Sequence, residues 1–287
     1  MSMSQMSKQM TLEGQELLSA RIHKASDIIR RVKENSQLPL IVNFSGGRDS
    51  QVLLDLVQQV TSDFFCFYMV SGIDWKESLQ HVENICREYD AKLMVSHPQD
   101  YSSCWSVRVN GFFERLERFG YWPTVKKQWC SIYLKIRPQR QVLRRVFGVK
   151  LRRKSGKWKP QSIFKLNGVR REESSRRMQI YRRLAKSGYM VKDPNQPEAM
   201  MVFPILDWTD KDVNDYLLLR GMKRKENPLY SKFGVSGCYY CPFFEPEIYR
   251  RIASEDPGLY DRFIEYERKL DRPAVIGNVW LRDIMER

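Results

Sequence analysis

The stretch that decides the fold is Ile41-Val42-Asn43-Phe44-Ser45-Gly46-Gly47-Arg48-Asp49-Ser50-Gln51-Val52-Leu53-Leu54. A short apolar run leads into a turn with two glycines, and the apolar residues after the turn have helical spacing. Gly46 and Gly47 can take positive φ or let another group approach the backbone closely. The first N–H groups of a helix lack partners inside it and lie at the positive end of its dipole, where phosphate binds well. An ordinary strand-to-helix turn is the alternative.

On both sides of this stretch, apolar runs alternate with helical patterns. Strands are predicted over residues 40–44, 64–71 and 92–96, and helices over residues 11–36, 48–60 and 76–89. The alternation predicts an α/β fold, with a parallel sheet that has helices on both sides. Ligands of such sheets lie at the carboxyl ends of the strands, so we expect Asp49 and Asp74 at that edge.

The rest of the chain continues this alternation less regularly. The pattern predicts helices over residues 100–118, 132–147, 209–219, 246–254 and 259–270, strands over residues 162–166 and 201–205, and a loop-rich stretch over residues 181–197. Thr209 suits the N-cap of its helix, with Asp212 three residues on. The aromatic residues Trp105, Phe112 and Phe113 look exposed on the first of these helices.

The charge of the chain is concentrated in one window. The 287 residues carry a net charge of +15, and between Arg137 and Lys186 there are 18 Lys or Arg residues against two acidic residues, a net charge of +16. A solvated face is the usual explanation of basic residues, but like charges repel in so one-sided a window unless an anion binds. The predicted partner is a nucleotide, a nucleic acid or both, and Trp105 and Trp158 are candidates for stacking on bases.

The cysteine content and the hydropathy of the chain indicate the cellular compartment in which the protein is expected. No apolar run is long enough to span a membrane, and residues 1–10 lack the apolar segment of a signal peptide. We therefore expect a cytoplasmic protein whose six cysteines are reduced. Cys66 and Cys86 lie in apolar patterns and are expected in the core, while Cys104 is undecided.

Three further cysteines form a pattern of their own. Cys238 and Cys241 lie in a Gly-Cys-x-x-Cys-Pro element, and Cys130 follows a tryptophan. A Cys-x-x-Cys element fits a metal site, a redox pair or coincidence. Zinc would need a fourth ligand beside three thiolates, and none of the three histidines is near these motifs in the sequence.

A second turn with glycine and basic residues follows the strand predicted over residues 162–166. Its sequence is Gly168-Val169-Arg170-Arg171-Glu172-Glu173-Ser174-Ser175-Arg176. Arg170 and Arg171 are expected to reach phosphate or sulfate oxygens, because planar guanidinium groups suit such anions. An ordinary cationic helix start is the alternative, but arginines at a helix N-terminus oppose the helix dipole. A bound anion removes this conflict.

These motifs carry a family resemblance. Ser45-Gly46-Gly47-Arg48-Asp49-Ser50 resembles the PP-loop of the ATP pyrophosphatases, and the second turn resembles the Gly-x-Arg-x-x-Glu-Ser-x-x-Arg signature of phosphoadenylyl-sulfate reductases. From Ser45 to Pro242 the chain resembles the phosphoadenosine phosphosulfate reductase-like branch of the PP-loop superfamily. The resemblance implies a parallel sheet of five or six strands between helices. We expect a nucleotide-binding α/β domain over residues 1–224 and a small helical, cysteine-bearing part over residues 225–287.

The resemblance also implies a set of site residues. The expected nucleotide-binding residues are Ser45, Gly46, Gly47, Arg48, Asp49, Ser50, Asp74, Gly168, Arg170, Arg171, Glu172, Ser174 and Arg176. Asp49 is expected to position Mg²⁺ on the phosphates of ATP, since carboxylate oxygens suit that ion, and Asp49, Arg170 and Arg171 are the expected catalytic residues. Cys130, Cys238 and Cys241 are expected to hold a 4Fe-4S cluster with one iron open unless another ligand binds it. Zinc and free thiols stay open as alternatives.

Two activities recur in this branch: reduction of adenylyl sulfate, and adenylation of a substrate by ATP followed by displacement of AMP by sulfur. Thioredoxin-dependent reductases carry their attacking cysteine in a C-terminal tail, whereas no cysteine follows Cys241 here. The chain also resembles the ATP-pyrophosphatase subunits of DNA phosphorothioation systems. The leading prediction is therefore an enzyme that adenylates DNA, or tRNA by analogy, binds it through Arg137–Lys186 and takes sulfur from a donor such as a cysteine desulfurase. The alternatives are a reductase and a binding module without catalysis.

Overall fold

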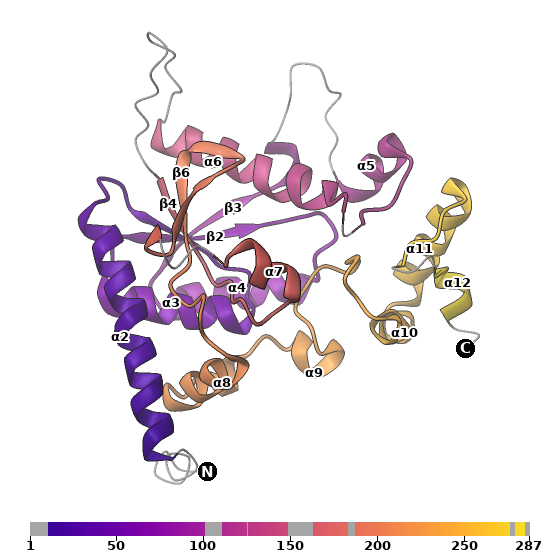
Figure 1. Ribbon diagram of the computed structural model, residues 1–287. Coiled ribbons are helices and arrows are strands. Elements are labelled where there is room, and N and C mark those ends of the chain that lie inside the picture. Colours follow the sequence, from indigo (N-terminus) through magenta and orange to yellow (C-terminus); the bar gives the residue numbers. More distant parts are fainter. Residues whose placement is uncertain are drawn as a thin grey trace. The chain divides into compact units, whose positions relative to one another are not determined.

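The computed structural model describes residues 11–100, 111–124, 126–148, 163–182, 187–275 and 279–284 (Figure 1). The chain divides into two compact units. The first contains Met1–Tyr68, Gln80–Met94 and Phe147–Asn227, and the second contains Met69–Leu79, Val95–Val146 and Pro228–Arg287. The last transition between units lies close to the domain boundary expected at residues 224 and 225, but the second unit also includes two earlier segments. The two expected domains stay a prediction.

A six-stranded sheet has the order β3-β2-β1-β4-β6-β5. Its strands are β1 (Leu40–Asn43), β2 (Phe64–Met69), β3 (Lys92–Ser96), β4 (Ile163–Asn167), β5 (Met190–Asp193) and β6 (Gln196–Val202). β1 pairs in parallel with β2 and β4, and β4 pairs in parallel with β6, while β5 runs antiparallel to β6. The predicted α/β fold is confirmed, with one antiparallel strand at the edge.

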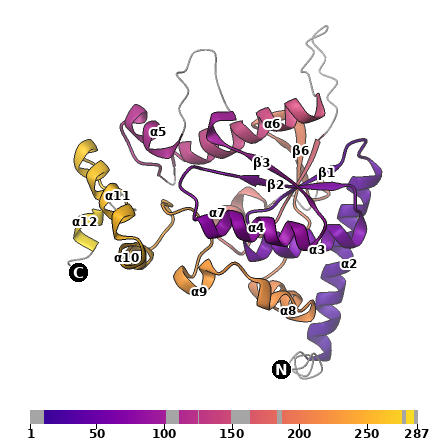
Figure 2. The same ribbon diagram turned by 180° about the vertical axis from the view of Figure 1, so that it is seen from behind.

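The helices of the first unit include one that is buried along most of its length. The elements are α2 (Leu12–Glu34), α3 (Arg48–Val60), α4 (Lys76–Glu88, which begins in the second unit), α7 (Ser175–Ile180), α8 (Asp210–Leu219) and the short η5 (Met222–Lys225). Every residue of α3 from Ser50 to Val57 is buried. This fits its neighbours, because α3 contacts α2, α8, β1 and β4, and Figure 2 shows α3 and α4 from behind. α3 therefore holds the turn at its N-terminus rigidly.

The second unit is helical and packs around aromatic side chains. Its elements are η2 (Pro98–Asp100), α5 (Phe112–Phe119), the π-helix η3 (Ser131–Ile136), α6 (Arg137–Phe147), α9 (Leu229–Phe233), α10 (Pro246–Glu255), α11 (Pro257–Leu270) and α12 (Leu281–Ile284). Phe112 and Phe113, which look exposed in the sequence, are buried in this core with Trp122 and Tyr240. That expectation was wrong because the aromatic stripe of α5 packs on the C-terminal helices. Trp105 and Cys104 lie outside the described residues.

The stretch predicted to be a loop over residues 181–197 contains a strand and the start of another. β5 and β6 form a hairpin in which the polar residues Asp193 and Gln196 are buried. Lys165 of the neighbouring strand β4 contacts the carboxylate of Asp193 and donates to Gln196 Oε1 at 3.2 Å. The sequence pattern missed the hairpin because Asp193, Gln196 and Glu198 are buried polar residues, which break the apolar alternation expected of a strand. Another difference lies at residues 132–147, where the first part of the predicted helix is the π-helix Ser131–Ile136 and only the remainder is α-helical.

Among the described residues, no helix combines the length and the apolar character needed to cross a bilayer. The expected burial of two cysteines is confirmed, since Cys66 of β2 and Cys86 of α4 both lie in the core of the first unit.

Candidate functional site: two glycine turns and a cysteine centre

The first glycine turn, Ser45–Ser50, lies between the end of β1 and the start of α3, as predicted. Gly47 is the N-cap of α3, and Gly46 has a φ of +76°. A Cβ on Gly46 would also lie 3.1 Å from Val82 Cγ2 and 3.3 Å from His81 Cδ2. The backbone conformation and the close packing both require glycine at this position.

The two serines of this turn have different surroundings. Ser50 is buried, its hydroxyl donates to the Gly47 carbonyl at 2.8 Å, and the Ser45 amide donates to it at 3.3 Å. Ser45 is exposed, and its hydroxyl accepts from the Gly47 amide at 3.3 Å. Ser50 therefore braces the turn from inside, while Ser45 presents its hydroxyl at the surface. Arg48 lies 3.5 Å from a carboxylate oxygen of Glu226.

The second glycine turn, Gly168–Arg176, follows β4 and touches the first. β1 and β4 are adjacent and parallel, and at their ends Asn43 Nδ2 donates to Asn167 Oδ1 at 2.7 Å. A Cβ on Gly168 would lie 2.8 Å from the carbonyl carbon and oxygen of Asp49, nearer than real Cβ atoms come to such atoms. Only glycine fits there, and its absence of a side chain is what lets the two turns meet.

Arg170 belongs to the second turn, and its side chain contacts Asp49 of the first turn. The residue is 5% exposed. Its Nε donates to Asp49 Oδ1 at 2.9 Å and its Nη2 to Asp210 Oδ1 at 2.6 Å, while Nη1 is 3.4 Å from Glu172 Oε2. The sequence predicts a contact with phosphate or sulfate for this guanidinium, and the structure places it among three carboxylates. Glu172, another predicted nucleotide contact, is one of these three.

Burial and charge act in opposite directions on this group. Burial by itself would lower the pKa of Arg170, but Asp49 and Asp210 raise that pKa above its ordinary value. Burial raises the pKa of Asp49, although the neighbouring Arg170 opposes that shift. The ion pair therefore stabilises the charged form of a carboxylate that burial alone would favour in its neutral form.

Arg171 is held by a different acid. Its Nη1 lies 2.5 Å from Asp207 Oδ1, and its amide donates to the Leu206 carbonyl at 2.9 Å. Asp207 also accepts from Tyr189 Oη at 2.6 Å and from Lys24 Nζ at 3.1 Å. Burial tends to raise the pKa of Asp207, but these hydrogen bonds outweigh burial and lower that pKa.

The end of the second turn forms a helix start. Ser174 is the N-cap of α7, and its hydroxyl accepts from the Arg177 amide at 3.2 Å. The structure thus gives Ser174 a capping contact, which is a normal role for serine at this position. Arg176 lies in α7, and its side chain is outside what the structure describes.

The cysteine centre lies in the second unit. Cys130, Cys238 and Cys241 are partly buried and pack against the same aromatic core. Lys135 Nζ donates to Cys238 Sγ at 3.1 Å, and Ser71 Oγ lies 3.2 Å from the same sulfur. All three cysteines that the sequence singles out therefore lie in the second unit, and Lys135, five residues after Cys130, contacts one of them, Cys238.

Asp74, predicted to lie with the nucleotide-binding residues, is a neighbour of Cys238 in the second unit. Its carboxylate accepts from the Ser71 amide at 2.5 Å and the Gly72 amide at 3.1 Å. The distance from Cys238 Sγ to Asp74 Oδ1 is 3.7 Å, and the two residues form an isolated β-bridge. This turn fixes the Asp74 carboxylate next to the thiol.

The donor chemistry of this centre fits an iron–sulfur cluster, because cysteine thiolates are its usual ligands. Burial raises the pKa of Cys130, and it raises the pKa of Cys241 to about 11, so a bound metal would have to displace these protons. In the described part of the chain, no three His, Cys, Asp or Glu side chains lie close enough together to hold one metal ion as they stand.

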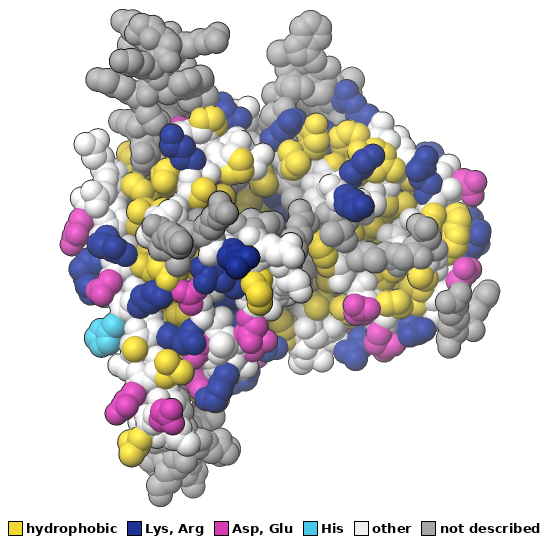
Figure 3. Space-filling model, in the orientation of Figure 1, with side chains coloured by type: hydrophobic (Ala, Val, Ile, Leu, Met, Phe, Trp, Pro, Cys, Tyr) yellow, Lys and Arg dark blue, Asp and Glu magenta, His cyan; other side chains and the backbone are white. Residues whose placement is uncertain are grey.

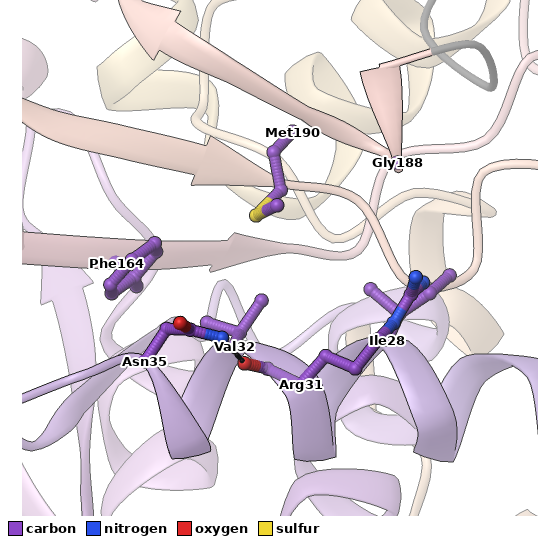
Figure 4. A pocket seen from close by; sticks show the side chains of 7 residues that line it. All are labelled: Ile28, Arg31, Val32, Asn35, Phe164, Gly188 and Met190. Carbon is purple, nitrogen blue, oxygen red and sulfur yellow. Dashed lines mark hydrogen bonds between the residues drawn. The ribbon is translucent and has the colours of Figure 1, made fainter.

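A separate pocket of about 180 Å³ lies between α2 and the strands β4 and β5 (Figure 4). Its lining residues are Ile28, Arg31, Val32, Asn35, Phe164, Gly188 and Met190. The walls are mainly apolar, and the lining includes no residue of the two glycine turns. This pocket is not part of the candidate site.

Sequence reasoning missed the acids that hold the arginines. Asp207 and Asp210 flank Thr209, whose capping box with Asp212 is confirmed. The sequence does indicate that Arg170 and Arg171 need anionic partners if they are buried. It does not indicate which acidic residues of the chain are these partners.

Comparison with known proteins identifies a matching family and relatives of this chain. The family model described as the phosphoadenosine phosphosulfate reductase domain matches residues 39–244. Two uncharacterised proteins of Methanocaldococcus jannaschii are 27% identical over 264 residues and 26% identical over 260 residues. Each alignment covers 90% of this chain but only 56% and 47% of the relative, so the chain spans about half the length of the curated relatives it matches.

Solved structures with a similar fold include two enzymes. A phosphoadenylyl-sulfate reductase from Candida auris, in its phosphate complex, has a TM-score of 0.49 and 13% identity, over 80% of this chain and 95% of the other. A U34-tRNA thiolase from Methanococcus maripaludis, with its 4Fe-4S cluster, has a TM-score of 0.49 and 17% identity, over 91% and 83%.

Proposed function

This chain belongs to the phosphoadenosine phosphosulfate reductase domain family of the PP-loop superfamily, and on that basis we propose that it is an ATP pyrophosphatase that adenylates nucleic acid for sulfur transfer. The observation that carries the proposal is the backbone contact between the two glycine turns. It places the N-terminus of α3, the Asp49 carboxylate and the paired arginines at one edge of the sheet, where nucleotides bind in such folds.

The chemistry assigned to this edge is transfer of AMP. An oxygen of the substrate attacks the α-phosphorus of ATP, the bond from that phosphorus to the bridging oxygen breaks, and pyrophosphate leaves. The amides at the start of α3 and the Ser45 hydroxyl would bind phosphate oxygens, and Asp49 would hold Mg²⁺. A sulfur nucleophile then displaces AMP from the adenylated substrate.

The three cysteines of the second unit would supply the sulfur chemistry. Cys130, Cys238 and Cys241 are the residues that would hold a 4Fe-4S cluster, and such a cluster with an open iron supplies a binding position for sulfide. Lys135 and Ser71 contact Cys238, and hydrogen bonds of this kind tune the properties of a cluster. Support for the cluster is the donor set, and zinc remains the second choice.

Nucleic acid is proposed as the substrate because of the charge distribution. The window Arg137–Lys186 has a net charge of +16, as large as the net charge of +15 of the whole chain. Part of this window, residues 149–162 and 183–186, lies outside the described residues. Figure 3 shows Lys and Arg side chains across one face of the described surface, with acidic side chains among them. A basic window of this kind would bind the phosphate backbone.

The decisive experiment measures AMP and pyrophosphate released from ATP by anaerobically purified protein, with and without DNA or tRNA. We expect pyrophosphate release that increases when one nucleic acid is added, and an equal amount of free AMP once sulfide is supplied to displace it. Asp49→Asn should abolish the release, while Asp63→Asn, which changes an exposed acid of the same unit, should not. Absence of pyrophosphate under every condition would rule out the proposed reaction.

A second candidate is reduction of adenylyl sulfate or phosphoadenylyl sulfate, and the name of the matching family favours it. A reductase would consume the sulfate nucleotide with an electron donor, produce sulfite and ignore nucleic acid. Sulfite production together with no release of pyrophosphate from ATP would select this candidate over the first.

A further inference from the structure

The side chain of Arg170 connects three separate pieces of the first unit. Its Nε holds Asp49 at the start of α3, its Nη1 faces Glu172 of its own turn, and its Nη2 holds Asp210 at the start of α8. A planar guanidinium has its donors in a fixed fork, so fixing one edge of the fork fixes the direction of the others. The position of Asp49 therefore depends on what holds the far edge of Arg170.

Asp210 is unusual among these carboxylates because its side chain is 76% exposed, whereas that of Arg170 is 6% exposed. Its Oδ1 lies 2.6 Å from Arg170 Nη2, and its amide donates to Glu172 Oε2 at 2.6 Å. An exposed carboxylate gains little from an isolated ion pair. Here it contacts the outer edge of a guanidinium whose inner edge holds Asp49.

The helix that carries Asp210 does not need it as a cap. Thr209 is the N-cap of α8, and its hydroxyl accepts from the Asp212 amide while the Asp212 carboxylate accepts from the Thr209 amide at 2.6 Å. This capping box already satisfies the start of the helix. The contact of Asp210 with Arg170 is thus not needed to cap α8.

We propose that Asp210 is a positioning residue which, through Arg170, fixes the orientation of the Asp49 carboxylate in the first glycine turn. The proposal deepens the proposed function, because Asp49 is the group assigned to Mg²⁺ there. Asp210 makes no hydrogen bond to the first turn, although its negative charge acts directly on Asp49 and adds to the raised pKa of that carboxyl. The positioning effect is transmitted by the guanidinium, so it must disappear when that guanidinium is replaced.

The test compares Asp210→Asn with Asp215→Asn, a matched change on the same helix. Asp215 pairs with Lys211 at 2.5 Å and does not contact Arg170. We expect D210N to raise the Mg²⁺ concentration that gives half-maximal nucleotide binding by about tenfold, as outer-shell changes commonly do. Saturating Mg²⁺ should restore pyrophosphate release, and D215N should behave as the wild type.

A double variant tests whether Arg170 transmits the effect. Lysine at position 170 keeps the charge but lacks the planar fork of donors with which Arg170 contacts these carboxylates. In the Arg170→Lys background, D210N should therefore lose its tenfold effect on the Mg²⁺ requirement and leave only the small change that comes from removing its own charge. Fully additive effects of the two substitutions would overturn the proposal.

Amide hydrogen exchange gives a readout that needs no activity. In the protein without nucleotide, D210N should speed exchange in peptides that cover Ser45 to Leu53 several-fold, and D215N should not. Equal exchange in the two variants would overturn the role of Asp210. If D210N alone speeds exchange while the wild type neither binds nor cleaves ATP, the proposed function fails and the positioning role stands.

Discussion

The backbone of Gly168 lies against the backbone of Asp49 so closely that a Cβ would come within 2.8 Å of the Asp49 carbonyl group. Gly168→Ala should therefore push the two turns apart. We expect a loss of about 1–3 kcal/mol in the free energy of unfolding, as for overpacked sites, and a larger loss of nucleotide binding. Urea unfolding and calorimetric titration with Mg-ATP measure the two effects.

Gly258→Ala is the control for that change. Gly258 lies in α11, where an added Cβ meets one side-chain oxygen at 3.9 Å, an ordinary contact. Alanine in a helix should stabilise the protein by about 0.5–1 kcal/mol and leave nucleotide binding unchanged. Equal stability of G168A and wild type would show that the turns can separate freely.

His81, next to the first glycine turn, should make the protein sensitive to acid. Burial lowers the pKa of His81 below its ordinary value of 6.5. A lowered pKa in the folded state means that stability is complete above pH 6.5 and is lost as the pH falls through the folded-state pKa. His81→Gln, which cannot titrate, should flatten this fall. The measurement is the free energy of unfolding between pH 8 and pH 5, a range set by histidine titration.

The matched control for this pH effect is His23→Gln, which changes an exposed histidine of α2 in the same unit. The pH profile of that variant should follow the wild type. If H81Q and wild type lose stability in parallel, His81 does not cause the acid sensitivity.

Replacing Cys238 tests the cysteine centre. Cys238→Ser should lower the iron content and the visible charge-transfer absorption of anaerobically purified or reconstituted protein, because a serine hydroxyl is a poor substitute for a thiolate ligand. Cys86→Ala, which changes a buried thiol of the other unit, should retain both signals. A colourless protein with one zinc per chain would replace the cluster by zinc, and unchanged iron in C238S would remove Cys238 from the ligands.

The basic window should control the salt dependence of nucleic-acid binding. One variant changes four residues that lie outside the described part of the chain to alanine: Lys150, Arg152, Arg153 and Lys154. The slope of log Kd against log salt should decrease by about 0.9 for each duplex phosphate that the variant no longer neutralises. The control changes four exposed basic residues outside the window: Arg87, Arg118, Arg251 and Lys269. Equal slopes for both variants would argue against this window as the binding region.

Asp55 anchors α3 away from the turn. It accepts hydrogen bonds from Tyr216 Oη at 2.6 Å, Arg220 Nε at 2.9 Å and Tyr89 Oη at 3.0 Å. Asp55→Ala would leave these donors without their acceptor and should cost about 3 kcal/mol of stability. The exposed Asp63→Ala, also in the first unit, should cost about 1 kcal/mol or less. Equal urea midpoints for the two variants would contradict the anchoring role.

Local sequence was sufficient to predict the strand, turn and helix elements at the edge of the sheet where the two glycine turns lie. The first turn was predictable because Gly46, Gly47 and the apolar residues around them have the spacing of a strand, a turn and a helix. The second turn was predictable for the same reason, and adjacent parallel strands bring the ends of β1 and β4 together. Thr209 and Asp212 likewise showed the start of α8 through contacts within one turn of the chain.

The partners of the arginines could not be predicted from local sequence. Arg170 is held by Asp49 and Asp210, which lie 121 and 40 residues away in the chain. Lys135 and Ser71 reach Cys238 across 103 and 167 residues. Any of the chain's 34 acidic residues could meet the electrostatic requirement of the arginines, so only the fold could select the partners.

The buried contact between Lys165 and Asp193 has a consequence for how the outer half of the sheet assembles. Neighbouring residues of a strand face opposite sides, so a slip of β5 by one residue would turn the Asp193 carboxylate away from the lysine. A buried ammonium without its counterion costs several kcal/mol. A hairpin paired in the wrong register is therefore destabilised by an unpaired buried charge as well as by poor packing. The Lys165–Asp193 pair thus favours the correct register of β5.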